Sequence, residues 1–197
     1  MAAVALDALV SSRTPGAGAF HAFLAQLIFA AGAAIALLTS KGWHDDPEFA
    51  EDMARPSLGL LANITVGLVV VQVALGAAVR HKLMGSGFHI TFALVVALAI
   101  VIVGVLVMNQ CAQHRTLRPC SVMMMVITGT QVFLGFGAFI TRMMAEDRTP
   151  PDVIATVAHV TTGALTLAST VILALQLRRH LRPAALLKER SKGAVLP

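Results

Sequence analysis

Five long stretches of the chain contain no Asp, Glu, Lys or Arg, and short polar connections separate them. They lie at residues 19–39, 58–79, 88–108, 121–141 and 153–177. A helix needs about 20 apolar residues to cross the hydrocarbon core of a bilayer. Because lipid offers no hydrogen-bond partners, every backbone N–H and C=O must be paired within the segment, which requires a helix. The pattern predicts an all-α membrane protein with five transmembrane helices.

Composition agrees with this prediction, since 57% of the 197 residues are hydrophobic and only 13% are charged. Soluble domains have roughly 25% charged residues. No connection is long enough to form a soluble domain. We therefore divide the chain into an outer N-terminal arm (1–18), an extra transmembrane helix with a cytoplasmic acidic loop (19–57), a four-helix bundle (58–179) and a basic tail (180–197).

Positive charges are divided unequally between the two sides of the predicted bundle. Ten lie on the side of the tail, namely Lys41, Arg55, Arg115, Arg118, Arg178, Arg179, Arg182, Lys188, Arg190 and Lys192; five lie on the other, namely Arg13, Arg80, Lys82, Arg142 and Arg148. The positive-inside rule then predicts a protein of the cell (inner) membrane with its N-terminus outside and its C-terminus cytoplasmic. The tail is a contact for anionic lipid head groups of the bilayer. No basic fold or aromatic platform accompanies the charge, so we expect no nucleic-acid binding.

One pattern occurs twice along the chain. Each copy is an apolar segment with a glutamine inside it and an arginine at its end, followed by an apolar segment with a histidine near its start. The copies are QVALGAAVR with HITFA and QVFLGFGAFITR with HVTTG, and their marked residues are Gln72, Arg80 and His89 in the first and Gln131, Arg142 and His159 in the second. Two such units predict one binding site shared by two histidines.

The two histidines occupy equivalent places and similar depths. Both lie within the first two turns of their predicted helices, and at 1.5 Å rise per residue their depths differ by about 8 Å. A histidine inside a spanning helix usually faces the bundle interior. One such residue would most simply form an interhelical hydrogen bond. Repetition favours a ligand pair, because neutral imidazole is a common axial ligand in helical bundles.

A haem fits this pair better than a bare metal ion. An ion would need three or four protein ligands, and the spanning stretches contain no carboxylate or thiol. Haem requires only two axial ligands, which we predict to be His89 and His159. Clearance for the ring would come from small residues, although these are also common at membrane helix contacts. They are Gly76, Ala93, Gly135 and Gly163.

Arg80 and Arg142 end their segments at the predicted depth of the site, where guanidinium groups suit haem propionates; the alternative is that they reach the membrane surface. Buried amides need hydrogen-bond partners, so Gln72 and Gln131 either join helices or contact the ring.

Several other polar and sulfur-containing residues are not expected to bind a cofactor. Cys111 and Cys120 bracket a loop with His114 between them, which falls short of a closed zinc set. We expect His44 and His180 to be exposed. The run Met123 to Met125 is expected to pack or to face lipid.

The runs QVALGAAVRH with GFHITFA and QVFLGFGAFITR with IATVAHVTTGAL resemble the carboxy-terminal half of haem A synthase, a membrane protein of cytochrome oxidase assembly. The resemblance covers about residues 19–179. It implies that His89 and His159 hold a b-type haem. FHAFLAQL resembles the family's fourth helix, which would make His21 the equivalent of a ligand in the missing half. The family's catalytic half, with its membrane carboxylate, is absent, as is its outer cysteine pair.

We therefore expect a membrane b-type cytochrome in which His89 and His159 bind haem b. It would transfer single electrons to a redox partner as a subunit of a larger respiratory or photosynthetic complex. One alternative is a half-size haem A synthase that acts on haem O as a homo-oligomer, with His21 in a second site. Another is a haem-free scaffold subunit.

Overall fold

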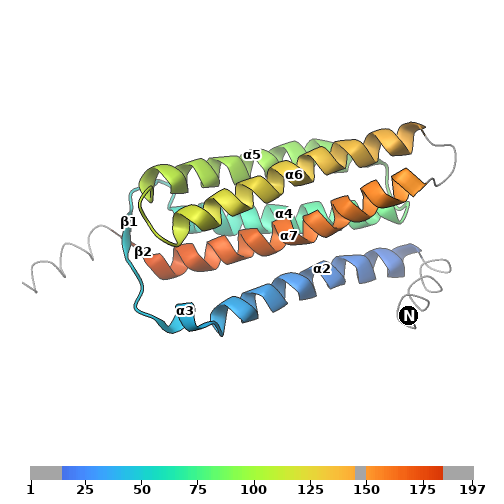
Figure 1. Ribbon diagram of the computed structural model, residues 1–197. Helices are drawn as coiled ribbons and strands as arrows, with labels where there is room; N and C mark the ends of the chain where they lie inside the picture. Colours follow the sequence, from blue (N-terminus) through green and yellow to red (C-terminus); the bar gives the residue numbers. More distant parts are fainter. Residues whose placement is uncertain (1–14, 145–149, 184–197) are drawn as a thin grey trace, which may run out of the picture.

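The protein is described by a computed structural model covering residues 15–144 and 150–183 (Figure 1). Five helices in it are long and apolar enough to cross a membrane: α2 (Pro15–Leu38), α4 (Leu58–Arg80), α5 (Ser86–Gln110), α6 (Leu117–Met144) and α7 (Pro150–His180). A one-turn helix, α3 (Lys41–His44), follows α2. The predicted class, an all-α membrane protein with a helical bundle, is confirmed.

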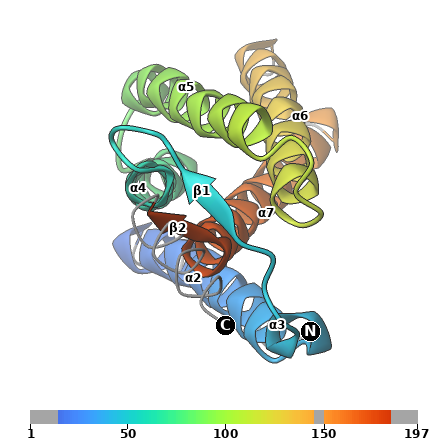
Figure 2. The ribbon, with the colours of Figure 1, turned by 90° about the vertical axis from the view of Figure 1, so that its left-hand side faces the viewer.

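Helices α4, α5, α6 and α7 pack as a bundle in which each contacts the next and α7 returns to α4. Helix α2 lies outside this bundle against α4 and α7, as the end view shows (Figure 2). The most deeply buried side chains belong to the bundle and include Leu58, Ile100, Leu117, Met124, Leu167, Leu173 and Leu177. In α2, by contrast, only Gly18, Ala19 and Ala30 are buried. The four-helix bundle is therefore the core, and α2 is an addition to it.

Some helices begin earlier than the charge-free stretches. Helix α6 begins at Leu117 and α7 at Pro150, where a proline is well tolerated because the first N–H groups of a helix have no intrahelical acceptor. The first turn of α7 therefore contains Asp152, which is buried. The charge-free stretch 153–177 contains no carboxylate, because Asp152 lies one residue before it.

A short strand pair closes one end of the bundle. Strand β1 (Ala50–Asp52) lies parallel to β2 (Leu181–Pro183), with Ala50 opposite Leu181. The α2–α4 connection, the α5–α6 turn and the end of α7 all lie at this end (Figure 1). The sequence analysis did not predict these strands.

His180 is buried, with only 4% of its surface exposed, which corrects the expectation that it is exposed. Its Nδ1–H donates to the backbone oxygen of Glu48 (2.7 Å), and Nε2–H of His114 donates to the same oxygen (3.0 Å). Nδ1 of His114 accepts the backbone N–H groups of Thr116 and Leu117, both at 3.2 Å. These two histidines attach the polar connection after α2 to the bundle. We refer to them, with Glu48, as the histidine clamp.

Candidate functional site

The histidines of the two repeats meet inside the bundle. His89 lies in the first turn of α5 and His159 in the third turn of α7. Their ring centroids are 6.2 Å apart, and the ring planes are nearly perpendicular, at 86°. Both residues are half-buried. One imidazole from each copy of the repeat thus contributes to a single place in the fold.

The amide of Gln72, on α4, holds His89 at two points. Its Nε2 group donates to Nδ1 of the ring (3.0 Å) and to the backbone oxygen of His89 (3.1 Å). Nδ1 is therefore the acceptor nitrogen, and the ring proton lies on Nε2. This contact attaches the start of α5 to α4.

His159 has the opposite arrangement. Its Nδ1–H donates to the backbone oxygen of Gln131 on α6 (3.3 Å), so the lone pair lies on Nε2. The Gln131 side-chain Nε2 is 3.4 Å from this nitrogen. An N–H bond from the second nitrogen to a backbone carbonyl is the arrangement that orients metal-binding imidazoles. The second copy of the repeat therefore presents a ring nitrogen suited to a ligand role.

A glycine four residues after each glutamine lies against the imidazole of the same repeat. A Cβ atom at Gly76 would be 3.1 Å from Cε1 of His89, and one at Gly135 would be 2.8 Å from Cε1 of His159. Such distances are shorter than ordinary carbon contacts, so the absence of a side chain is what lets each ring lie close to the neighbouring helix. The motif Gln-x-x-x-Gly thus forms a cradle for the histidine of the following helix.

Four glutamine side-chain oxygens are buried without a hydrogen-bond partner within the described part of the chain: those of Gln26, Gln72, Gln131 and Gln176. Buried polar atoms are rarely left unpaired, so such atoms often mark a site for a ligand, ion or water. Gln26 comes from α2, and the position of a Cβ at Gly163 would be 3.7 Å from its Oε1 and 3.1 Å from Nε2 of Gln131. Gln26 was missed, although it too is a glutamine inside an apolar stretch.

The structure gives the other predicted site residues different surroundings. Nη1 of Arg142 donates to Oδ2 of Asp152 at 3.2 Å, so this arginine joins the ends of α6 and α7. Arg80 is exposed at the end of α4, and Ala93 is half-buried on α5. Gly163 lies against glutamine side chains. His21 lies on α2, outside the bundle, and is exposed. Ring clearance at Ala93 and Gly163, and propionate binding by the arginines, stay predictions.

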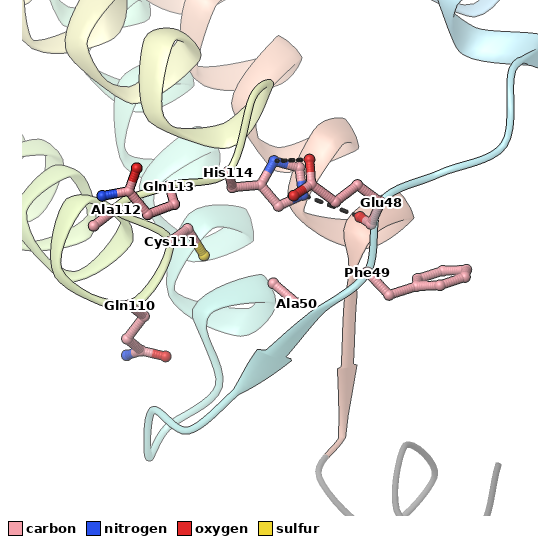
Figure 3. Close-up of a pocket in the computed structure, with 8 residues that line it drawn as sticks. All are labelled: Glu48, Phe49, Ala50, Gln110, Cys111, Ala112, Gln113 and His114. Carbon is pink, nitrogen blue, oxygen red and sulfur yellow. Dashed lines mark hydrogen bonds and ion pairs between the residues drawn. The ribbon is translucent and has the colours of Figure 1, made fainter. Parts of the chain in front are cut away.

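A pocket of about 260 Å³ lies beside the histidine clamp, lined by Glu48, Phe49, Ala50, Gln110, Cys111, Ala112, Gln113 and His114 (Figure 3). Burial, and then the negative charge of Asp52, raise the pKa of the Cys111 thiol, which disfavours the thiolate that metals bind. Both cysteines are free. Across the described residues, no group of three or more His, Cys, Asp or Glu side chains is arranged to hold a metal ion.

The sulfur-rich run on α6 packs as expected. Met124 is buried, Met123 is exposed, and the side chain of Met125 lies against Gly104 on α5.

Comparisons of the chain with protein-family models, with curated proteins and with solved structures found no match. The assignment of function therefore depends on the geometry of the site.

Proposed function

We propose that the protein is a membrane b-type cytochrome in which His89 and His159 are the axial ligands of one haem b. The observation that carries the proposal is the pair of neighbouring imidazoles, whose ring centroids are 6.2 Å apart and which come one from each copy of the repeat. Two imidazoles that bind one metal ion from opposite sides at about 2 Å place their ring centres roughly 6 Å apart. A haem with both axial positions filled by protein carries one-electron transfer.

The donor set and its surroundings support this proposal. Nε2 of His159 carries a lone pair, while Nδ1–H is held by the backbone oxygen of Gln131. In His89 the Gln72 amide nitrogen donates to Nδ1, so the ring proton is on Nε2. For Nε2 to bind iron, the proton must be on Nδ1 instead. Gln72 then turns its amide so that Oε1, which has no partner, accepts the Nδ1–H bond. Gly76 and Gly135 keep the space beside both rings free of side chains. In this arrangement the two rings bind the iron, the Gln72 amide and the Gln131 backbone oxygen orient the rings, and the two glycines give them room. The Gln131 amide, now 3.4 Å from Nε2 of His159, turns away from the iron.

Arg142 and Arg80 lie at the ends of α6 and α4. Under the proposal they bind haem propionates, and Arg142 exchanges part of its contact with Asp152 for one with a propionate. Outside the spanning helices, residues 15–144 and 150–183 form only short connections and one strand pair, so electrons pass to or from another membrane subunit or a redox partner. The proposed orientation puts the strand pair and the C-terminal tail in the cytoplasm.

One observation favours a second function. Each imidazole already has an amide partner, Gln72 for His89 and Gln131 for His159. Such pairs also join helices without any cofactor, as in a haem-free scaffold subunit of a membrane complex. The two functions differ in a single measurable property, the presence of haem in the purified protein.

The test is the reduced-minus-oxidised absorption spectrum of the detergent-purified protein, followed by pyridine extraction to identify and count the haem. We expect one haem b per chain with a low-spin spectrum. His89→Ala and His159→Ala should each lose the haem. His44→Ala, which changes an exposed histidine, is the matched control and should retain it.

Colourless wild-type protein would favour the scaffold function. Full haem retention in either histidine variant would overturn the ligand assignment. Haem O or haem A in the extract would indicate the half-size synthase instead.

A further inference from the structure

A cleft of about 370 Å³ is lined by residues from the end of α2, from α3 and the residues after it, and from the end of α7. The ends of α2 and α7 lie at the same end of the molecule as α3 (Figure 1). One part of its wall is apolar and includes Leu38, Trp43, Pro47 and Leu175. The other part is cationic and consists of Arg178, Arg179 and Arg182. Because α2 and α7 are spanning helices, this cleft lies at the boundary between hydrocarbon and water.

The structure fixes the Arg179 guanidinium without neutralising it. The group lies over the Trp43 ring, 4.8 Å from its centroid. It donates to the backbone oxygens of Gly42 (2.8 Å) and Asp45 (2.5 Å). All these partners are uncharged, so they orient the arginine and leave its positive charge in place.

Arg182 is also held by an aromatic ring and a backbone oxygen. Its guanidinium lies 4.7 Å from the centroid of the Phe49 ring and donates to the backbone oxygen of Leu181 (2.9 Å). Arg178 is exposed. Within residues 15–144 and 150–183, none of the three guanidinium groups forms an ion pair with a carboxylate. Asp45 and Asp46 are close in sequence to α3, but both are exposed and neither lines the cleft.

We propose that this cleft binds the phosphate of an anionic phospholipid head group. Guanidinium groups donate paired hydrogen bonds to phosphate oxygens, and basic pockets between membrane helices on the cytoplasmic side are known to hold such head groups. The apolar wall and the exposed side chains of Ile35 and Leu38 on α2 provide a path for the acyl chains. A free phosphate ion shares the head-group chemistry but makes no use of the apolar wall.

Such a lipid would strengthen the weakest packing in the fold. Helix α2 buries few side chains of its own, whereas the cleft joins the end of α2, α3 and the end of α7. A phosphate held by arginines of α7 and β2, with its acyl chains along α2, attaches the peripheral helix to the bundle. This inference does not depend on whether the bundle binds haem.

The experiment is a lipid titration of the delipidated full chain in detergent, read by native mass spectrometry. The probes are phosphatidylglycerol, phosphatidylcholine and inorganic phosphate. The test variant is R178Q/R182Q, and the matched control is R115Q/R118Q, which removes the same charge from exposed residues at the same end of the bundle. R178Q alone changes an exposed side chain and leaves the packing of Arg182 on Phe49 intact.

We expect one phosphatidylglycerol per wild-type chain, bound in preference to phosphatidylcholine and not displaced by millimolar phosphate. Affinity should fall about 25-fold in R178Q/R182Q and about fivefold in R178Q, since each arginine near the surface contributes roughly fivefold. The control should bind as the wild type does. Equal weakening in the control, equal binding of phosphatidylcholine, or displacement by inorganic phosphate would each overturn the proposal.

Discussion

At the scale of single residues, the two cradle glycines are distinguished from the other glycines of their helices by what lies opposite them. A Cβ at Gly135 would be 2.8 Å from Cε1 and 3.2 Å from Nδ1 of His159. A Cβ at Gly137, two residues further along α6, would meet nothing within 4 Å. The two positions therefore allow one substitution to be compared in a filled and an open environment.

Gly135→Ala should lower the stability of the protein by about 1–3 kcal/mol, because the ring or the helix must shift to admit the methyl group. Gly76→Ala should have a smaller effect, since its nearest atom is 3.1 Å away. Gly137→Ala is the control and should be nearly neutral. Thermal unfolding in detergent measures all three, and equal melting temperatures for Gly135→Ala and Gly137→Ala would contradict the cradle.

At the scale of helices and loops, the histidine clamp joins segments that are far apart in sequence. His114 accepts two N–H groups at the start of α6 and donates to Glu48, 66 residues earlier. His180 donates to the same oxygen from a position 132 residues later. The backbone oxygen of Glu48 thus joins the α2–α4 connection to the α5–α6 turn and to the end of α7.

His114→Ala should lower the free energy of unfolding by about 1–3 kcal/mol, because it leaves the Thr116 and Leu117 N–H groups without their acceptor. Hydrogen exchange at these two amides should accelerate. His44→Ala, at an exposed position on α3, should leave both the melting temperature and the exchange rates unchanged. Unchanged protection at Thr116 and Leu117 in His114→Ala would show that the imidazole does not cap α6.

The histidine clamp is an example of contacts that could not be predicted from the sequence. The five spanning helices could be predicted because charge cannot be placed in hydrocarbon at low cost, and that constraint acts on each segment separately. The repeat likewise identified His89 and His159, which the structure brings together. Contacts such as His180 with Glu48, or β1 with β2, depend on how distant segments meet, and no local pattern of residues records this. Gln26 was missed for the same reason, since the rotation of α2 against α7 is set by packing.

At the scale of the whole molecule, the distribution of positive charge and the directions of the helices together predict how the protein is oriented in the membrane. Alternating helices bring the α2–α4 connection, the α5–α6 turn and the end of α7 to the same end of the bundle. That end contains the basic residues Lys41, Arg55, Arg115, Arg118, Arg178, Arg179 and Arg182. The other end, where α4 and α6 end and α5 and α7 begin, has Arg80, Lys82 and Arg142. Since short loops rich in Lys and Arg stay in the cytoplasm, the strand pair should face the cytoplasm.

Reporter fusions measure this orientation directly. A green fluorescent protein joined after residue 197 should fluoresce, because it folds in the cytoplasm, and alkaline phosphatase at the same position should be inactive. Phosphatase inserted in the α4–α5 connection, after Met84, should be active. The opposite pattern would place His89 and His159, which lie nearer the α4–α5 and α6–α7 connections, close to the cytoplasmic surface. Under the proposed function, electron exchange would then need a cytoplasmic partner, whereas the predicted orientation would need a partner on the outer side of the membrane.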